Sequence, residues 1–285
     1  MRALEVLATG PLALVQDLGR PGYAHLGVPP SGALDVAALR LANRLVGNAE
    51  SCAGVESVLG GLSVRATASC TVAVTGPPVR VRLDRREVGS HVAVHLRAGQ
   101  TLTVGTPSTG LRCYLAASGG IAAEPSMGSR SRDVLSGIGP DPLAPGALLP
   151  LGTTRGVPAG ADVVVPRPAP AELVVPVVLG PRDDWLDDVA RGLSTWWTVT
   201  SASNRVGLRL DGPPLRRAEA FAETELPSEG LLTGAIQLPP NGLPVVFLAD
   251  HPTTGGYPVA ATVRQGSLDA LGQVRPGTKL RFDPS

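Results

Sequence analysis

Glycine and proline interrupt this chain so often that no element of regular structure can run far. The 285 residues include 35 Gly and 28 Pro, spread along the whole length. Between them lie short runs in which apolar and polar residues alternate, such as LSVRAT (62–67), TLTVG (101–105) and GLRLDG (207–212). An alternation with a period of two, bounded by turn residues, is typical of a half-buried strand. The sequence therefore predicts a mainly β fold.

The same alternation predicts further strands at 70–76, 79–84, 91–96, 112–120, 196–203, 234–239 and 244–250. Short helices are predicted at 31–48, 181–193 and 267–274, where apolar residues recur at helical spacing. Ser31 is expected to cap the first of these, and Gly47 with Asn48 to end it. Ser267 is expected to cap the third, and Asp183 and Asp184 to lie in the first turn of the second. These helices would cover the β structure.

The length suggests one large domain or two medium ones. The Pro-rich run at 156–176 predicts a boundary, with an N-terminal half at 1–166 and a C-terminal half at 167–285. AGQTLTVG (98–105), PGALLPLG (145–152) and PGTKLRFD (276–283) repeat one pattern, a Gly turn that leads into a strand. Such repeats suit two related β units, although short patterns of this kind also recur by chance.

Composition excludes several classes of protein. The net charge is +1 and aromatic residues make up 3%, so neither nucleic acid nor a membrane surface is an expected partner. The three cysteines form no metal-binding spacing and no even set of disulfides, so a cytoplasmic protein without a metal site is expected. No signal peptide and no apolar run of membrane-spanning length is found. Lys279 is the only lysine, which excludes a P-loop and biotin attached to this chain.

Polar side chains gather at turns in the N-terminal half. The stretch DLGRPGYAHLGVPPSGALD (17–35) contains Asp17, and the loop SMGSRSRD (126–133) follows later. In the second loop, which contains Ser129 and Ser131, backbone N–H groups and the guanidinium groups of Arg130 and Arg132 suit an anion. The alternatives are that Asp17 pairs with Arg20 to hold the turn and that the second loop is a solvated basic loop. The candidate ligand-binding residues here are Arg20, Tyr23, His25 and Arg130.

Two further clusters lie in the C-terminal half. Arg205 and Arg209 are four residues apart, so both would face one side of a strand and address one ligand or acidic surface. The alternative is that both are surface residues of an edge strand. In the segment 236–258, an apolar strand leads into a polar, Gly-rich loop. Functional sites often lie on such loops. Its candidates are Asp250, His251 and Thr254 as catalytic residues, with Gln237, Gly255 and Gly256 as binding residues.

These segments, taken in order, resemble a known family. DLGRPGYAHLGVPPSGALD, ANRLVGN (42–48), GSRSRD, SNRVGLRL, IQLPPNGLPVVFLAD and TTGGYP are similar to the biotin-dependent carboxyltransferase-like proteins, also called allophanate hydrolase subunit 2. That family includes the C subunit of 5-oxoprolinase, the KipA protein and part of urea carboxylase. The resemblance implies two cyclophilin-like β-barrel subdomains.

The resemblance also implies a function in an assembly. The first expectation is the C subunit of an ATP-dependent 5-oxoprolinase, inactive alone, which acts with a KipI-like B subunit in converting 5-oxo-L-proline to L-glutamate. ATP with Mg²⁺ would bind in the assembled complex, and a lactam-utilisation A subunit would assist. The alternatives are the carboxyltransferase component of a urea carboxylase or allophanate-type system, and a KipA-like regulator that antagonises a kinase inhibitor.

The chain departs from the family pattern at His251, where a Gln is usual, and at Arg132, where a Thr is frequent. For the proposed substrate, Arg20 and Arg130 are expected to meet Asp250 and Thr254 in one pocket that accepts a carboxylate or phosphate. Since these residues lie on loops, substitutions are expected to reduce turnover and to change stability little.

Overall fold

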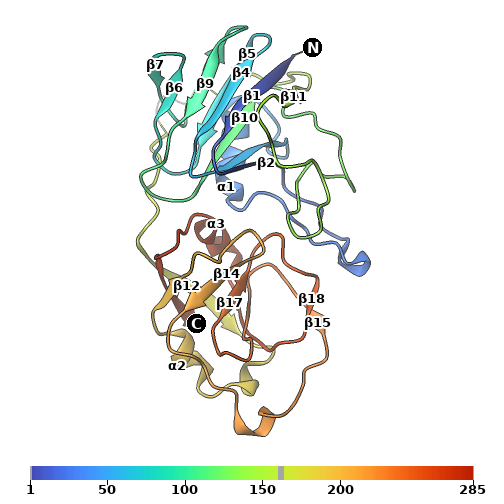
Figure 1. Ribbon diagram of the computed structural model, residues 1–285, viewed down its shortest axis with the longest axis vertical. Coiled ribbons are helices and arrows are strands. Elements are labelled where there is room, and N and C mark those ends of the chain that lie inside the picture. Colours follow the sequence, from blue (N-terminus) through green and yellow to red (C-terminus); the bar gives the residue numbers. More distant parts are fainter. Residues whose placement is uncertain (1, 160–163, 285) are drawn as a thin grey trace. The chain divides into compact units, whose positions relative to one another are not determined.

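The computed structural model describes residues 2–159 and 164–284, so part of the Pro-rich run, residues 160–163, lies outside the described residues. Two compact units are present (Figure 1). The first contains the chain up to Arg20, Ser31–Asp133 and Gly137–Ala169. The second contains Pro21–Pro30, Val134–Ser136 and the chain from Pro170 onward. Whereas one boundary is predicted between residues 166 and 167, two short segments of the N-terminal half belong to the second unit.

The first unit is built on two antiparallel sheets. One contains, in order, β11 (Leu148–Pro150), β1 (Ala3–Thr9), β4 (Leu62–Ala66), β9 (Thr101–Val104), β6 (Val81–Leu83) and β7 (Arg86–Val88). The other contains β2 (Leu12–Gln16), β3 (Gly54–Val58), β10 (Arg112–Ala117), β5 (Cys70–Thr75) and β8 (Val94–Leu96). Val6 and Val64 of the first sheet share a buried core with Val15 and Leu115 of the second, so the two sheets pack face to face.

The helix α1 (Val36–Leu45) covers β5 and β10. It begins later than predicted, because Asp35 rather than Ser31 accepts the capping hydrogen bond, from Ala38 N at 2.9 Å. Ser31 is buried with a φ of 53°, and its Oγ donates to Arg132 O. The predicted cap at Ser31 is therefore wrong.

The approach to α1 is fixed by a buried carboxylate. Glu56 Oε2 accepts hydrogen bonds from Tyr114 Oη at 2.7 Å and Leu34 N at 3.1 Å, while Arg112 Nε lies 3.4 Å from Oε1. Burial and the neighbouring Glu56 raise the pKa of the Tyr114 phenol well above its ordinary value, so its hydroxyl remains a donor. Asp35 N in turn donates to Tyr114 Oη, which holds the start of the helix on the sheet.

The second unit contains a closed barrel. Its strands are, in order, β12 (Glu172–Leu179), β19 (Val259–Val263), β16 (Ala235–Gln237), β17 (Val245–Phe247), β14 (Gly207–Asp211), β13 (Trp197–Val199) and β20 (Lys279–Pro284). The parallel pairing of β12 with β20 completes the ring, in which the other pairs are antiparallel. A two-stranded sheet, β15 (Glu229–Gly230) with β18 (Thr254–Gly255), accompanies it. The mainly β prediction is confirmed.

The remaining helices are short. The predicted helix at 181–193 divides into the 3-10 turn η2 (Asp183–Trp185) and α2 (Val189–Leu193). The helix α3 (Leu268–Leu271) lies in the third predicted segment, but Ser267 makes no side-chain capping bond. The other 3-10 turns are η1 (Ala24–Leu26), η3 (Glu219–Phe221) and η4 (Gln265–Ser267).

The three repeated turn patterns fold alike. Gly99, Gly146 and Gly277 have φ of 85°, 89° and 90°, a left-handed conformation that favours glycine. The strands β9, β11 and β20 begin two residues after these glycines, at Thr101, Leu148 and Lys279. The pattern therefore predicts the local structure correctly at all three places.

The three cysteines are free thiols, and all belong to the first unit. Cys70 and Cys113 are buried in the core, whereas Cys52 is half-buried. Within residues 2–159 and 164–284, no helix combines the length and apolar character needed to cross a lipid bilayer.

One buried histidine predicts a pH dependence. Burial lowers the pKa of His91 from its ordinary 6.5, against the opposing effect of a hydrogen bond to the Gly76 backbone. The unfolded chain therefore binds more protons at this position, and stability falls as pH drops below about 6.5. His91→Asn, which suits the φ of 61°, is expected to flatten this part of the pH profile of the melting temperature. His95→Asn is the matched control, since His95 is exposed; an unchanged slope in His91→Asn would contradict the assignment.

Candidate functional site

Asp17 holds the Ser–Arg loop, residues 126–133, beside the end of β2. Its carboxylate accepts hydrogen bonds from Ser129 Oγ and Ser131 Oγ, both at 2.6 Å, and from Arg130 N at 2.7 Å. Both serines are fully buried. Their hydroxyl groups donate to Asp17, and the prediction that this loop binds an anion through its backbone N–H and guanidinium groups stays a prediction.

Arg20 supports the same loop from within the unit. Its side chain is 2% exposed, and its guanidinium donates to the carbonyl oxygens of Ser126 and Ser131. A buried guanidinium bonded to main-chain carbonyls orders the loop. The predicted role of Arg20 in binding substrate stays a prediction and gains no support from this burial.

The opening stretch divides between the units after Arg20. Tyr23 and His25 lie in the second unit, where Tyr23 precedes η1 and the exposed His25 places Nδ1 3.1 Å from Gly22 O. A pocket that joins Arg20 and Arg130 to Asp250 and Thr254 requires residues from both units. That convergence stays a prediction.

Arg205 and Asp250 form a buried ion pair in the second unit. Arg205 Nε donates to Asp250 Oδ2 at 2.8 Å, and a terminal nitrogen donates to Oδ1 at 3.0 Å. Val134 N also donates to Oδ2, at 3.0 Å, which ties the segment 134–136 to the barrel. The side chains are 2% and 0% exposed. A fully buried carboxylate held by two guanidinium hydrogen bonds stabilises the fold. This arrangement gives no support for a role of Asp250 as a base.

The prediction that Arg205 and Arg209 face one side of a strand is wrong. The strand β14 begins at Gly207, so Arg205 precedes it and the period of two does not extend that far. Arg205 is buried against Asp250, whereas Arg209 is exposed.

The Gly-rich loop of the second unit, which follows β17, packs against the end of β16. Gln237 is buried and its Nε2 donates to Tyr257 O at 2.8 Å. A Cβ on Gly255 would lie 2.7 Å from Gln237 Nε2, so the absence of a side chain here lets Gln237 pack against the loop. His251 is buried, with Nδ1 2.7 Å from Pro252 O, while Thr254 and Gly256 are exposed.

The structure thus pairs Arg205 with Asp250, places Gln237 against Gly255, and joins Arg20 to the loop that carries Arg130. The catalytic roles predicted for Asp250, His251 and Thr254 stay predictions.

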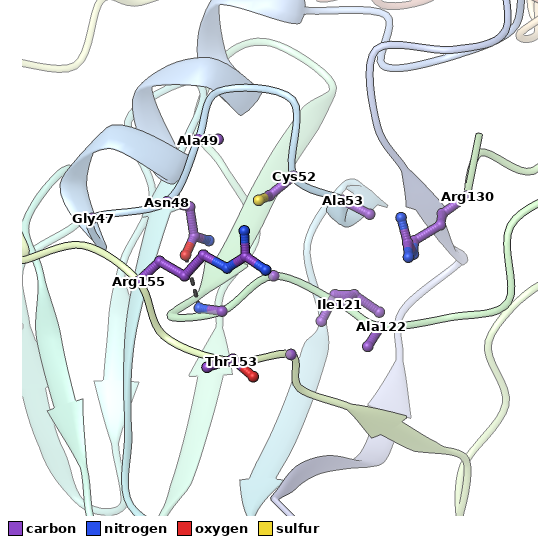
Figure 2. Close-up of a pocket in the computed structure, with 13 residues that line it drawn as sticks. Gly47, Asn48, Ala49, Cys52, Ala53, Ile121, Ala122, Arg130, Thr153 and Arg155 are labelled. Atoms are coloured by element: carbon purple, nitrogen blue, oxygen red, sulfur yellow. Dashed lines mark hydrogen bonds between the residues drawn. The ribbon is translucent and has the colours of Figure 1, made fainter. Parts of the chain in front are cut away.

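A pocket of about 350 Å³ lies in the first unit, and Arg130 is the one predicted site residue that lines it (Figure 2). Three loops build it: the loop after α1, the loop after β10 and the loop after β11. The lining residues are Gly47, Asn48, Ala49, Cys52, Ala53, Gly119, Gly120, Ile121, Ala122, Arg130, Gly152, Thr153 and Arg155.

Asn48 joins two of these loops. Its Oδ1 accepts from Gly119 N at 2.7 Å, the hydrogen bond drawn in Figure 2, and its Nδ2 donates to Ala117 O and to Asn43 Oδ1. Its amide is therefore used in building the pocket. Gly119 has a φ of 94°, and a Cβ there would lie 2.1 Å from Gly152 O, so only glycine allows the loops to approach.

The third loop is anchored by Arg2, the residue that precedes β1. Arg2 donates to the carbonyl oxygens of Ser118 and Gly152 and, through a second nitrogen, to Thr154 Oγ1 at 2.8 Å. A Cβ on Gly156 would lie 2.2 Å from Gly47 O, so this loop also packs closely on the end of α1. These contacts fix the backbone on either side of Arg155.

Sequence reasoning missed most of this pocket. The segments ANRLVGN and RCYLAASGG are recognisable as a helix end and a strand end, each with glycine. Their contact depends on Asn48 and Gly119, which are 71 residues apart. Arg155 follows β11 at the start of a Pro- and Gly-rich run, whose composition predicts only a linker.

Comparison with known proteins identifies the family. The model of the carboxyltransferase domain, subdomains A and B, matches residues 26–284. The chain is 36% identical to the C subunit of 5-oxoprolinase from Escherichia coli (strain K12), over 98% of this chain and 90% of that protein. The chain therefore belongs to the carboxyltransferase-domain family.

Solved structures agree on the fold. The crystal structure of TTHA0988 matches with a TM-score of 0.89 at 34% identity, over 99% of this chain and 56% of that one. The Kluyveromyces lactis urea amidolyase matches with a TM-score of 0.90 at 29% identity, over 99% of this chain. This chain spans about half of TTHA0988 and only 18% of the amidolyase.

Proposed function

We propose that this chain is the C subunit of a 5-oxoprolinase, the hydrolase complex that opens 5-oxo-L-proline to L-glutamate. The observation that carries the proposal is the similarity to the Escherichia coli protein, which extends over almost the whole of both chains. The similarity to urea amidolyase supports a second candidate, the carboxyltransferase component of a urea-carboxylating system. It is the weaker one, because this chain corresponds to 18% of that protein.

Other subunits complete the enzyme in this proposal. This chain binds a KipI-like B subunit, and a lactam-utilisation A subunit takes part. ATP with Mg²⁺ binds in the assembled complex, in the cytoplasm. The proposal includes no biotin on this chain; its only lysine, Lys279, lies on β20 and donates to Thr198 Oγ1. A KipA-like regulator would bind the same partner and perform no chemistry.

Reconstitution of the subunits tests the proposal. Loss of 5-oxoproline and release of ADP are measured with all subunits, with this chain alone and with this chain left out. The full set is expected to form glutamate, and this chain alone is expected to show no turnover, because none of the standard nucleotide or nucleophile motifs is present in its sequence. Turnover by the single chain would contradict the proposal that it acts as one part of a larger enzyme.

Complex formation is a separate expectation. Co-expressed with its KipI-like partner, this chain is expected to elute from a size-exclusion column in one peak with that partner. Elution of two separate monomers at micromolar concentration would contradict the predicted partner.

A further inference from the structure

The pocket of the first unit carries positive charge without a compensating acid. Arg130 and Arg155 line it, and none of its lining residues is an Asp or a Glu. In Figure 2 the two guanidinium groups lie on opposite sides of the pocket, and both side chains point inward. Among the described residues, neither arginine has a salt bridge within 4.0 Å. Two unpaired cations in a small concave site attract an anion.

The two arginines are held in different ways. Arg130 donates from Nε to Ala123 O at 2.7 Å, and its backbone is fixed by Asp17, which leaves the terminal nitrogens of the guanidinium for a ligand. Arg155 is exposed, but its loop is fixed by Arg2 and by the close contact of Gly156 with Gly47. The site is therefore preformed on one side and adaptable on the other.

Beside the arginines, the lining combines glycine backbone with four hydrocarbon side chains, and these indicate which class of anion fits. Ala49, Ala53, Ile121 and Ala122 present hydrocarbon groups, and Thr153 and Cys52 add a hydroxyl and a thiol. An inorganic anion would leave these hydrocarbon groups exposed to water, whereas a small organic acid would bury them under its own hydrocarbon part.

We infer that this pocket binds a small organic carboxylate, with Arg130 and Arg155 contacting the carboxylate group. The inference concerns binding and does not depend on the proposed function. If both are correct, 5-oxoproline and glutamate are the members of this class that the complex handles, and the pocket is where this chain receives one of them.

Cys52 provides a direct probe of occupancy. It lines the pocket, while Cys70 and Cys113 are buried in the core, so a neutral alkylating reagent reaches Cys52 first. The rate of Cys52 alkylation by iodoacetamide is measured by mass spectrometry on the full chain. The measurement is repeated with 5-oxoproline, glutamate, 2-pyrrolidinone and inorganic phosphate. 2-Pyrrolidinone is the lactam without its carboxylate.

The expected result is slower alkylation with at least one carboxylate and no protection by 2-pyrrolidinone. In Arg155→Gln the concentration needed for protection should rise about tenfold or more, the scale of a lost charge-assisted hydrogen bond. Arg130→Gln should behave alike. Arg85→Gln, an equal loss of charge at an exposed turn of the same unit, should leave protection unchanged. Gly156→Ala keeps every charge but displaces the loop, so it too should weaken protection.

Absence of protection by both carboxylates would overturn the inference. Equal protection by phosphate or by 2-pyrrolidinone would also overturn it, as would full protection in both arginine variants. Turnover of the wild-type complex separates the two proposals: if 5-oxoproline is consumed but Cys52 is not protected, the proposed function stands and the pocket is not the binding site.

Discussion

Arg205→Ala is expected to lower the free energy of unfolding of the second unit by about 3–5 kcal/mol, the usual cost of leaving one partner of a buried ion pair alone. Asp250, 0% exposed, would keep its charge without the two guanidinium hydrogen bonds. Asp250→Ala should cost a similar amount and also release Val134 N. This reverses the expectation from sequence that changes at Asp250 leave stability intact.

Fluorescence isolates the effect, since all three tryptophans, Trp185, Trp196 and Trp197, lie in the second unit. The urea midpoint of the fluorescence transition should fall in Arg205→Ala and stay within error in Arg209→Ala, the exposed arginine of the adjoining strand. The paired change to Leu at both Arg205 and Asp250 should cost less than either single Ala variant, because no buried charge remains. A wild-type midpoint in Arg205→Ala would show that the pair contributes little.

Asp17→Ala is expected to destabilise the first unit by about 3 kcal/mol or more, since each buried donor that loses its acceptor costs about 1–3 kcal/mol. Asp17 accepts from Ser129 Oγ, Ser131 Oγ, Arg130 N and Gly19 N. Loss of these bonds should also release the backbone of Arg130, and so weaken carboxylate protection of Cys52.

The cysteines report on this unit, because all three belong to it. In urea, the buried Cys70 and Cys113 should become reactive to a thiol reagent at a lower concentration in Asp17→Ala than in the wild type. Asp141→Ala is the control: Asp141 pairs with Arg132 in the same part of the chain but its side chain is 93% exposed. Equal thiol exposure in the two variants would contradict the role of Asp17 as an anchor.

Local patterns in the sequence predict the strands but not their partners. Alternation identifies β4, β9 and β14, and the Gly turns identify the starts of β9, β11 and β20. Among the strands that it misses are β1, β2, β3, β12 and β19. The strands β2, β3 and β19 are buried on both faces, β1 has an irregular burial pattern, and a proline interrupts β12. The first helix is placed too early because Ser31 and Asp35 are both good capping residues, and only the tertiary contact of Ser31 with Arg132 decides between them.

The partners of the candidate site residues could not be predicted from the sequence, because they are set by tertiary contacts between distant segments. Asp17 and Ser131 are 114 residues apart, and Arg205 and Asp250 are 45 apart, so what looks like a set of free polar groups is largely a set of mutual partners. The pocket of the first unit arises where three loops meet, and of its cationic residues only Arg130 belonged to a recognisable motif. Polar residues at turns, such as Asp17 and Asp250, here hold loops in place through partners that are distant in the sequence.

The most direct test of the central claim is glutamate formation from isotopically labelled 5-oxoproline by the reconstituted subunits, with labelled urea supplied in a parallel reaction. Labelled glutamate is expected only when ATP, Mg²⁺ and this chain are all present, and the labelled urea should remain unchanged. Glutamate formation at the same rate without this chain, or consumption of urea in place of 5-oxoproline, would contradict the assignment of this chain to a 5-oxoprolinase.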